Sequence, residues 1–157
     1  MYRIETGIDV GDSAPDFSLK DSVGDTVKLS DHIRKGNVVL AFYRGEADRY
    51  STQWLAGLRD DYLVIRGLDA EVLAVSADDA RTQLDTGGRY DLPFRLLSDP
   101  ECRVVRMYRV YDDFAKTATS AAFIVDRTGR IRYKYVSGAP PDLPSNTEII
   151  RHLRSIV

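Results

Sequence analysis

The sequence predicts an α/β fold in which a mixed central β-sheet is flanked by helices on both faces. Two continuous apolar runs, Val38–Tyr43 and Ala70–Val75, are typical of strands that are covered on both sides. A helical segment follows each run, and an antiparallel strand pair is expected on either side of this β-α-β unit. The order of elements therefore favours one mixed sheet within a single domain, residues 1–157.

The first expected elements are the two strands of an N-terminal hairpin, Pro15–Leu19 and Thr26–Leu29, on either side of the turn-rich segment Asp21–Asp25. Their apolar side chains recur at every second position, so one face of the hairpin is expected to point inward. These residues are Phe17, Leu19, Val27 and Leu29. Ser30 is then expected to cap one helical turn, Asp31–Arg34.

The stretch Asn37–Asp61 holds the central strand, a short polar loop and the start of a helix. The apolar side of that helix is expected to carry Trp54, Leu55, Leu58 and Tyr62. A strand that ends in a loop and leads into a helix often forms a site, because free backbone amides point into the cleft. Functional residues are therefore expected in this loop.

The second half of the chain supplies the remaining elements. A helix is expected over Asp78–Arg89, and another is expected to run from a cap at Asp99 to about Tyr108. The runs Ala121–Asp126 and Arg130–Val136, joined by a glycine-bearing turn, predict an antiparallel hairpin. A capping box that spans Ser145 to Glu148 precedes the closing helix, whose apolar residues are Ile149, Ile150, Leu153 and Ile156.

Composition excludes several classes of protein. The net charge of −2 does not call for nucleic acid or an anionic membrane as partner. No apolar stretch has the length of a bilayer and no secretory signal pattern is evident, so a cytoplasmic protein is expected. A single cysteine, Cys102, excludes an intrachain disulfide, and the distant His32 and His152 argue against a zinc site. No metal or cofactor is expected.

Several short blocks of the sequence follow one another in a characteristic order and at characteristic spacings. They are Gly11–Phe17, Gly24 with Val27 and Leu29-Ser30, Val38–Tyr43, Leu73–Asp78, Leu92–Phe94, Leu97–Pro100, and Phe123–Asp126 with Gly129 and Ile131. Together they resemble the peroxiredoxin family, in its bacterioferritin-comigratory branch and alkyl-hydroperoxide-reductase relatives. The resemblance covers about residues 7–157. It implies a thioredoxin fold with an N-terminal β-hairpin extension.

The resemblance also identifies the positions where the chemistry of the family takes place. Peroxiredoxins carry a Pro-x-x-x-Thr/Ser-x-x-Cys motif after a Phe-Tyr pair, and the cysteine thiolate attacks a peroxide to become a sulfenic acid. In this sequence Arg44 stands for the proline, Asp48 for the Thr or Ser, and Ser51 for the cysteine. The arginine of the family, which polarises the peroxide, corresponds to Ser120, or to Thr119 if the register is shifted by one.

These substitutions predict that the reaction of the family is lost at this site. A serine hydroxyl is a weak nucleophile without a base, and oxygen cannot follow the oxidation steps of sulfur. Asp48 is expected to cap the following helix and to accept the amide hydrogen bonds that would otherwise hold a thiolate or a peroxide. Arg49 stands where a second proline is usual. Two origins of Ser51 stay open, a natural serine and an engineered Cys→Ser change.

Cys102 offers a different site for thiol chemistry, because it is expected near the start of a helix, where the pKa of a thiol can be lowered. A structural role in the first turn of that helix is the alternative. Candidates for the lining of a pocket near residue 51 are Tyr43, Arg44, Arg49, Tyr50 and Trp54. Core packing is an equal expectation for Trp54.

Two functions are expected from different classes. The first is a peroxiredoxin-like binding or structural module without peroxidase activity, in the form of a homodimer, since relatives often pair near this site. The second is a thiol-dependent peroxidase, seen here as a Cys→Ser form at Ser51 or working through Cys102. Only the second would need a thioredoxin-type reductant. Neither function involves nucleic acid or a membrane.

Overall fold

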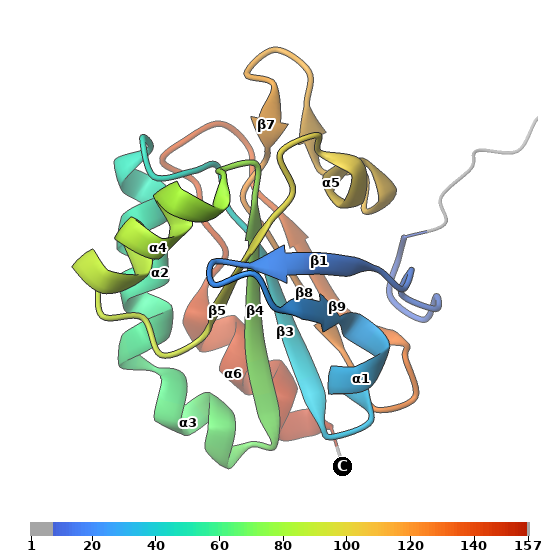
Figure 1. Ribbon diagram of the computed structural model, residues 1–157. Coiled ribbons are helices and arrows are strands. Elements are labelled where there is room, and N and C mark those ends of the chain that lie inside the picture. Colours follow the sequence, from blue (N-terminus) through green and yellow to red (C-terminus); the bar gives the residue numbers. More distant parts are fainter. Residues whose placement is uncertain (1–7, 157) are drawn as a thin grey trace, which may run out of the picture.

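The computed structural model describes residues 8–156, which build a mixed sheet of seven strands (Figure 1). The strand order is β2-β1-β5-β4-β3-β8-β9. Their bounds are β1 Ser18–Asp21, β2 Thr26–Lys28, β3 Asn37–Phe42, β4 Ala70–Ser76, β5 Arg95–Ser98, β8 Ala121–Val125 and β9 Ile131–Val136. The pairs β3–β4 and β4–β5 are parallel, and the other pairs in the sheet are antiparallel.

Helices cover both faces of this sheet. They are α1 Leu29–Ile33, α2 Arg49–Asp60, α3 Tyr62–Gly67, α4 Ala80–Arg89, α5 Arg103–Met107 and α6 Asn146–Ser155. One core cluster takes its helical side chains from α2, α3 and α6, and the cluster on the opposite face takes them from α1 and α5 together with the N-terminal hairpin. The predicted fold class, with helices on both faces and an N-terminal β-hairpin, is confirmed.

Strand β3 is the centre of both clusters, because all six of its residues are buried. Its side chains alternate between the faces, as the twofold repeat of a strand requires. Val39 and Ala41 enter one cluster, whereas Leu40 and Phe42 enter the other. Burial of one such large apolar side chain contributes about 1.5–3 kcal/mol. The strand is thus a fixed base for the loop that follows it.

Local signals predicted two helix starts correctly, those of α2 at Asp48 and of α6 at Ser145, and three others incorrectly. The side chain of Asp79 accepts a hydrogen bond from the backbone N of Thr82, so α4 begins at Ala80 rather than at Asp78. Ser145 caps α6 by accepting from the N of Glu148, as the capping box predicts. The cap at Ser30 was a wrong prediction, since α1 already begins at Leu29 without a side-chain cap.

The helix from Asp99 to Tyr108 is shorter than predicted. Cys102 has a left-handed backbone with φ of 56°, so α5 begins at Arg103 and Asp99 is not its N-cap. The Asp99 carboxylate nevertheless accepts from the backbone N of Arg103 and of Val105. A small hairpin that the sequence did not predict follows, formed by β6 Tyr111–Asp112 and β7 Thr117–Ala118.

The helix after the central strand is also interrupted. It was expected to reach Tyr62, but α2 ends at Asp60 and Tyr62 begins the separate helix α3. Within residues 8–156, no helix combines the length and apolar character that crossing a bilayer requires.

Candidate functional site

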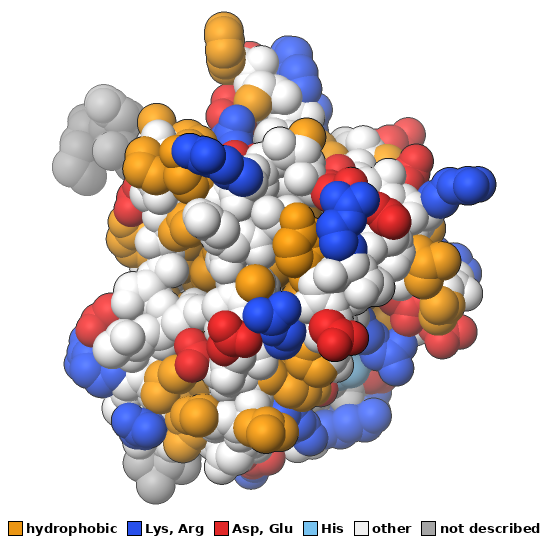
Figure 2. All heavy atoms as spheres, turned by 90° about the vertical axis from the view of Figure 1, so that its left-hand side faces the viewer, with side chains coloured by type: hydrophobic (Ala, Val, Ile, Leu, Met, Phe, Trp, Pro, Cys, Tyr) orange, Lys and Arg blue, Asp and Glu red, His pale blue; other side chains and the backbone are white. Residues whose placement is uncertain are grey.

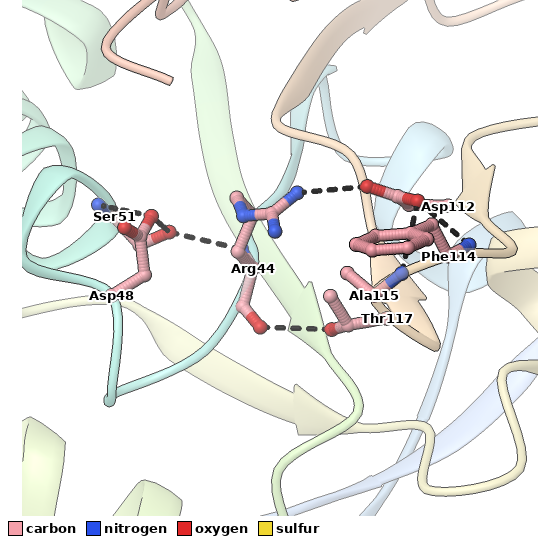
Figure 3. A network of polar contacts seen from close by, with 7 residues as sticks. All are labelled: Arg44, Asp48, Ser51, Asp112, Phe114, Ala115 and Thr117. Atoms are coloured by element: carbon pink, nitrogen blue, oxygen red, sulfur yellow. Dashed lines mark hydrogen bonds and ion pairs between the residues drawn. The ribbon is translucent and has the colours of Figure 1, made fainter. Parts of the chain in front are cut away.

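The loop after β3 ends at Asp48, which caps α2 (Figure 3). One oxygen of its carboxylate, Oδ2, accepts two hydrogen bonds from Ser51, from the backbone N at 3.2 Å and from Oγ at 2.9 Å. An Asp at this position satisfies an amide that the first helical turn leaves without a partner. The predicted cap is confirmed, and the amide of residue 51 is occupied by it.

The hydroxyl of Ser51 makes two hydrogen bonds within the protein. Its side chain is buried, with 0% exposure. Besides donating to Asp48, its Oγ accepts a hydrogen bond from the backbone N of Arg44 at 3.0 Å. Within residues 8–156, the acceptor for the hydroxyl proton is the Asp48 carboxylate, which is a weak base for an alcohol. The described histidines lie elsewhere, on α1 and α6.

Arg44 connects the start of α2 to the β6–β7 hairpin (Figure 3). Its guanidinium Nη1 donates to Asp112 Oδ2 at 3.2 Å, and its carbonyl O accepts from the hydroxyl of Thr117 at 2.8 Å. The pKa of Asp112 is lowered by the backbone N–H of Ala115 and by the Arg44 guanidinium. Asp112 and Thr117 are site residues that sequence reasoning missed, since this hairpin has no glycine or proline at its turn.

A second set of contacts ties the same loop to α4. The backbone N of Glu46 donates to Asp78 Oδ2 at 2.8 Å, and the carboxylate of Glu46 accepts from the hydroxyl of Thr86. Gly45 has φ of 132°, and a Cβ added there would lie 3.0 Å from Asp78 Oδ1. Burial raises the pKa of Asp78. The loop is therefore bound to the β6–β7 hairpin through Arg44 and to Asp78 and α4 through Glu46.

Two of the expected pocket residues belong to the core. Tyr43 is fully buried, its hydroxyl accepts from Gln83 Nε2 at 3.4 Å, and burial raises its pKa. Trp54 is 4% exposed, and its Nε1 donates to Asn146 Oδ1 at 3.0 Å. Tyr50 is half-buried near the surface, and the guanidinium of the exposed Arg49 lies 5.2 Å from the centre of its ring.

Ser120 immediately precedes β8, in which Ala121 is paired with Phe42 of β3. It is buried, and its carbonyl O accepts from the backbone N of Ser137 at 2.9 Å. Thr119 beside it lines a groove of about 480 Å³ together with Arg44. The fold thus brings the positions of Ser51, Arg44 and Ser120 to one end of β3, as the resemblance implies.

Cys102 lies apart from these residues. It is 4% exposed and belongs to the core cluster on the face of the sheet opposite to α2. Burial raises the pKa of its thiol, and the negative charge of Asp99 adds to this effect. At neutral pH it is therefore a thiol rather than the reactive thiolate.

Among the described residues, no group of His, Cys, Asp or Glu is arranged to hold a metal ion.

Comparison with known proteins gives consistent matches. Residues 10–134 match the AhpC/TSA family. Peroxiredoxin Bcp of Bacillus subtilis (strain 168) is 33% identical over 131 residues, which cover 79% of this chain and 82% of the relative. The chloroplastic peroxiredoxin Q of Triticum aestivum is 33% identical over 146 residues, covering 91% of this chain and 67% of the relative. The chain thus spans about two thirds of such chloroplastic relatives.

Among solved structures, peroxidoxin BcpB from Mycobacterium tuberculosis matches with a TM-score of 0.85 and 23% identity, over 94% of this chain and 97% of that one. This likeness confirms the thioredoxin-like fold. Because the relatives are named peroxiredoxins, they favour the expected thiol-dependent peroxidase over the expected binding module. The chain belongs to the AhpC/TSA family of peroxiredoxins and to its Bcp-like branch.

Proposed function

We propose that this protein keeps the scaffold of a thiol peroxidase but does not reduce peroxide at residue 51, and that it acts as a binding or structural module. The hydrogen bonding of Ser51 carries the proposal. Its buried hydroxyl donates its proton to Asp48 and accepts from the N of Arg44, and Asp48 also takes the amide of residue 51, so neither the hydroxyl proton nor this amide is left to donate to a peroxide oxygen. A hydroxyl in this position also has no route to a sulfenic acid.

The charge of Asp48 supports the same proposal. A thiol at position 51 would gain from the amides and the partial positive charge at the start of α2, which lower a thiol pKa. The Asp48 carboxylate lies in hydrogen-bond contact with residue 51 and would oppose this effect by like-charge repulsion. The Thr or Ser of the family motif carries no such charge. Restoring the cysteine alone is therefore expected to give a poor nucleophile.

A thiol-dependent peroxidase, reducing hydrogen peroxide and alkyl hydroperoxides, is the second candidate, and family membership favours it. It requires either that Ser51 replaces a natural cysteine or that Cys102 reacts. The burial of Cys102 and the raised pKa of its thiol argue against a peroxidase that works through Cys102. The first form needs a cysteine at position 51 to be active beside Asp48.

Peroxide consumption with dithiothreitol or a thioredoxin as reductant separates the candidates. The unaltered chain and its Cys102→Ser variant are expected to show the same background rate, and Ser51→Cys only a slow one. The double variant that carries both Ser51→Cys and Asp48→Thr is expected to consume peroxide faster than Ser51→Cys alone. Rapid turnover of Ser51→Cys by itself would instead favour the Cys→Ser form.

The state of Cys102 is measured separately. Mass spectrometry after stoichiometric hydrogen peroxide is expected to find its thiol unchanged. Rapid formation of a sulfenic or sulfinic acid would support the peroxidase that works through this residue. Ser51→Ala provides the matched control, because it leaves Cys102 and its surroundings untouched.

A homodimer is the proposed assembly. Support comes from Phe114, which is 99% exposed on the β6–β7 hairpin next to the groove that Arg44 lines. An exposed ring beside apolar groove residues is typical of a protein contact. Light scattering is expected to give a dimer mass that falls toward the monomer in Phe114→Ser. A monomer at all concentrations would reject this assembly.

A further inference from the structure

A separate polar cavity lies at the opposite end of the sheet from Ser51. It has a volume of about 310 Å³ and is bordered by α1, α3 and the first residues of β3, β4 and β5. Figure 1 shows α1 and α3 at the lower end of the sheet, whereas α2 starts at the upper end. The side chains that line it include His32, Lys35, Asn37, Arg66, Glu71 and Arg95.

Most charges around this cavity are already paired. Three ion pairs involve its lining residues: Arg66 with Glu71 at 3.8 Å, Arg95 with Asp21 at 2.8 Å, and Arg127 with Asp69. The Glu71 carboxylate also accepts hydrogen bonds from the hydroxyl of Tyr62. These pairs balance each arginine with one carboxylate. The net charge of the cavity lining is therefore determined by the charged side chains that do not take part in these ion pairs.

Lys35 is the principal group outside these pairs. Within residues 8–156 its ammonium group has no ion pair or hydrogen bond to a side chain. The arginines also keep donor capacity, because a guanidinium carries five N–H groups and each of these pairs uses only part of them. The cavity thus combines an unbalanced cation with several free N–H donors, which favours a ligand that is both negatively charged and rich in acceptors.

The position of His32 supports the same reading. It is half-buried on α1, where it faces Asp31, Lys35, Glu71 and Arg95. Burial lowers its pKa most, and the positive charges of Lys35 and Arg95 lower it further against the opposing carboxylates. Positive charge thus outweighs negative charge at the ring. Figure 2 shows Lys and Arg side chains gathered toward the lower right of the face, with Asp and Glu side chains between them.

We propose that this cavity binds a small molecule through a phosphate group. Its oxygens would accept from the Lys35 ammonium, from the remaining guanidinium N–H groups of Arg66 and Arg95, and from the Asn37 amide. The volume exceeds the need of a single phosphate, so the rest of the ligand has room beside it. The binding is independent of the chemistry at residue 51, which lies at the other end of β3.

Backbone amide shifts in an NMR titration of the full chain test this site, with pyrophosphate and inorganic phosphate as probes and chloride at equal ionic strength as control. Saturable shifts are expected at residues 35–37 and 66–71 for the two phosphates and not for chloride. Lys35→Gln is expected to weaken pyrophosphate about fivefold or more, as loss of one charge from a partly enclosed site does. Lys116→Gln, an exposed lysine paired with Asp113 on the distant hairpin, is expected to leave the affinity unchanged.

A pH series identifies the role of His32. Sulfate is the probe, because its charge does not change near neutral pH. Burial, Lys35 and Arg95 lower the pKa of His32, so the affinity is expected to rise only when the pH falls below the usual range of an imidazole and the ring becomes protonated, and His32→Gln is expected to remove this dependence. Shifts that do not saturate, or an affinity that is the same in Lys35→Gln, would overturn the proposal.

Discussion

Replacing Asp48 by Ala tests the hydrogen-bonded start of α2. The substitution removes the acceptor for the backbone N of Ser51 and, at the same time, the acceptor for its Oγ. Loss of an N-cap costs about 1 kcal/mol, and a buried hydroxyl left without its acceptor costs about 1–3 kcal/mol. Ser51 is 0% exposed in the unaltered chain, so its hydroxyl depends on Asp48 for its acceptor. We expect Asp48→Ala to lower the free energy of unfolding by about 2–4 kcal/mol.

A double-mutant cycle isolates the hydroxyl. Ser51→Ala in the Asp48→Ala background removes the unsatisfied group, so the double variant is expected to be more stable than the sum of the single changes by about 1–2 kcal/mol. Urea unfolding can be followed through the fluorescence of Trp54, which is the single tryptophan and is buried in α2. Additive effects in the cycle would refute the argument.

Asp79→Ala provides the matched control. Asp79 caps α4 by the same kind of bond, to the N of Thr82 at 2.8 Å, but it is exposed and holds no buried hydroxyl. Its replacement is expected to cost less than that of Asp48. Equal losses at the two caps would mean that burial of Ser51 adds nothing to the stability.

Four further substitutions test two carboxylates and the glycine of the loop, with a helical glycine as its control. Burial alone would raise the pKa of Asp126, but its hydrogen bonds lower it, so its stabilisation is present above about pH 4 and is lost on acidification. Asp126→Asn is expected to be less stable at neutral pH, with a flatter acid limb in thermal unfolding. Burial raises the pKa of Asp78, so Asp78→Asn is expected to gain stability relative to the unaltered chain as the pH rises from 3 to 7. Gly45→Ala is expected to cost about 1–3 kcal/mol in urea unfolding, because of its positive φ, whereas Gly88→Ala in α4, with open space around its Cα, is expected to stabilise.

The fold could be predicted because its signals are local or periodic. The run that became β3 is buried along its whole length, and the run that became β4 is buried except at Glu71, as is typical of hydrophobic strands in a parallel pair. The caps at Asp48 and Ser145 depend only on residues three positions ahead, so they could also be read from the sequence.

The errors arose where distant contacts decide the local structure. The left-handed backbone of Cys102 has no signal in its residue type, since such a conformation is usually reserved for Gly or Asn. The β6–β7 hairpin is held by Asp112, whose Oδ1 accepts from the backbone N of Phe114 and of Ala115, rather than by a glycine turn. Arg44 finds its partner Asp112 across 68 positions, which periodicity cannot indicate.

The positions of the candidate site could be located from the sequence, but their hydrogen bonds could not. Alignment with the family motif placed Ser51 and Asp48 correctly at the start of α2. It could not reveal that Arg44 would supply an amide to the Ser51 hydroxyl, because this bond depends on the path of the loop. Likewise, the sequence could not decide whether Tyr43 and Trp54 line a pocket or belong to the core, and only the structure places them in the core.

The backbone of Arg44 has a consequence for local motion. Its N–H and its C=O are both bound by side chains, those of Ser51 and Thr117, although it lies outside any helix or strand. Hydrogen exchange at this amide is therefore expected to depend on breaking its bond to the Ser51 hydroxyl, while the carbonyl of the same residue is bound to the β6–β7 hairpin. The loop, the start of α2 and the β6–β7 hairpin thus meet at one residue, so we expect fraying of the helix end and lifting of the hairpin to be coupled.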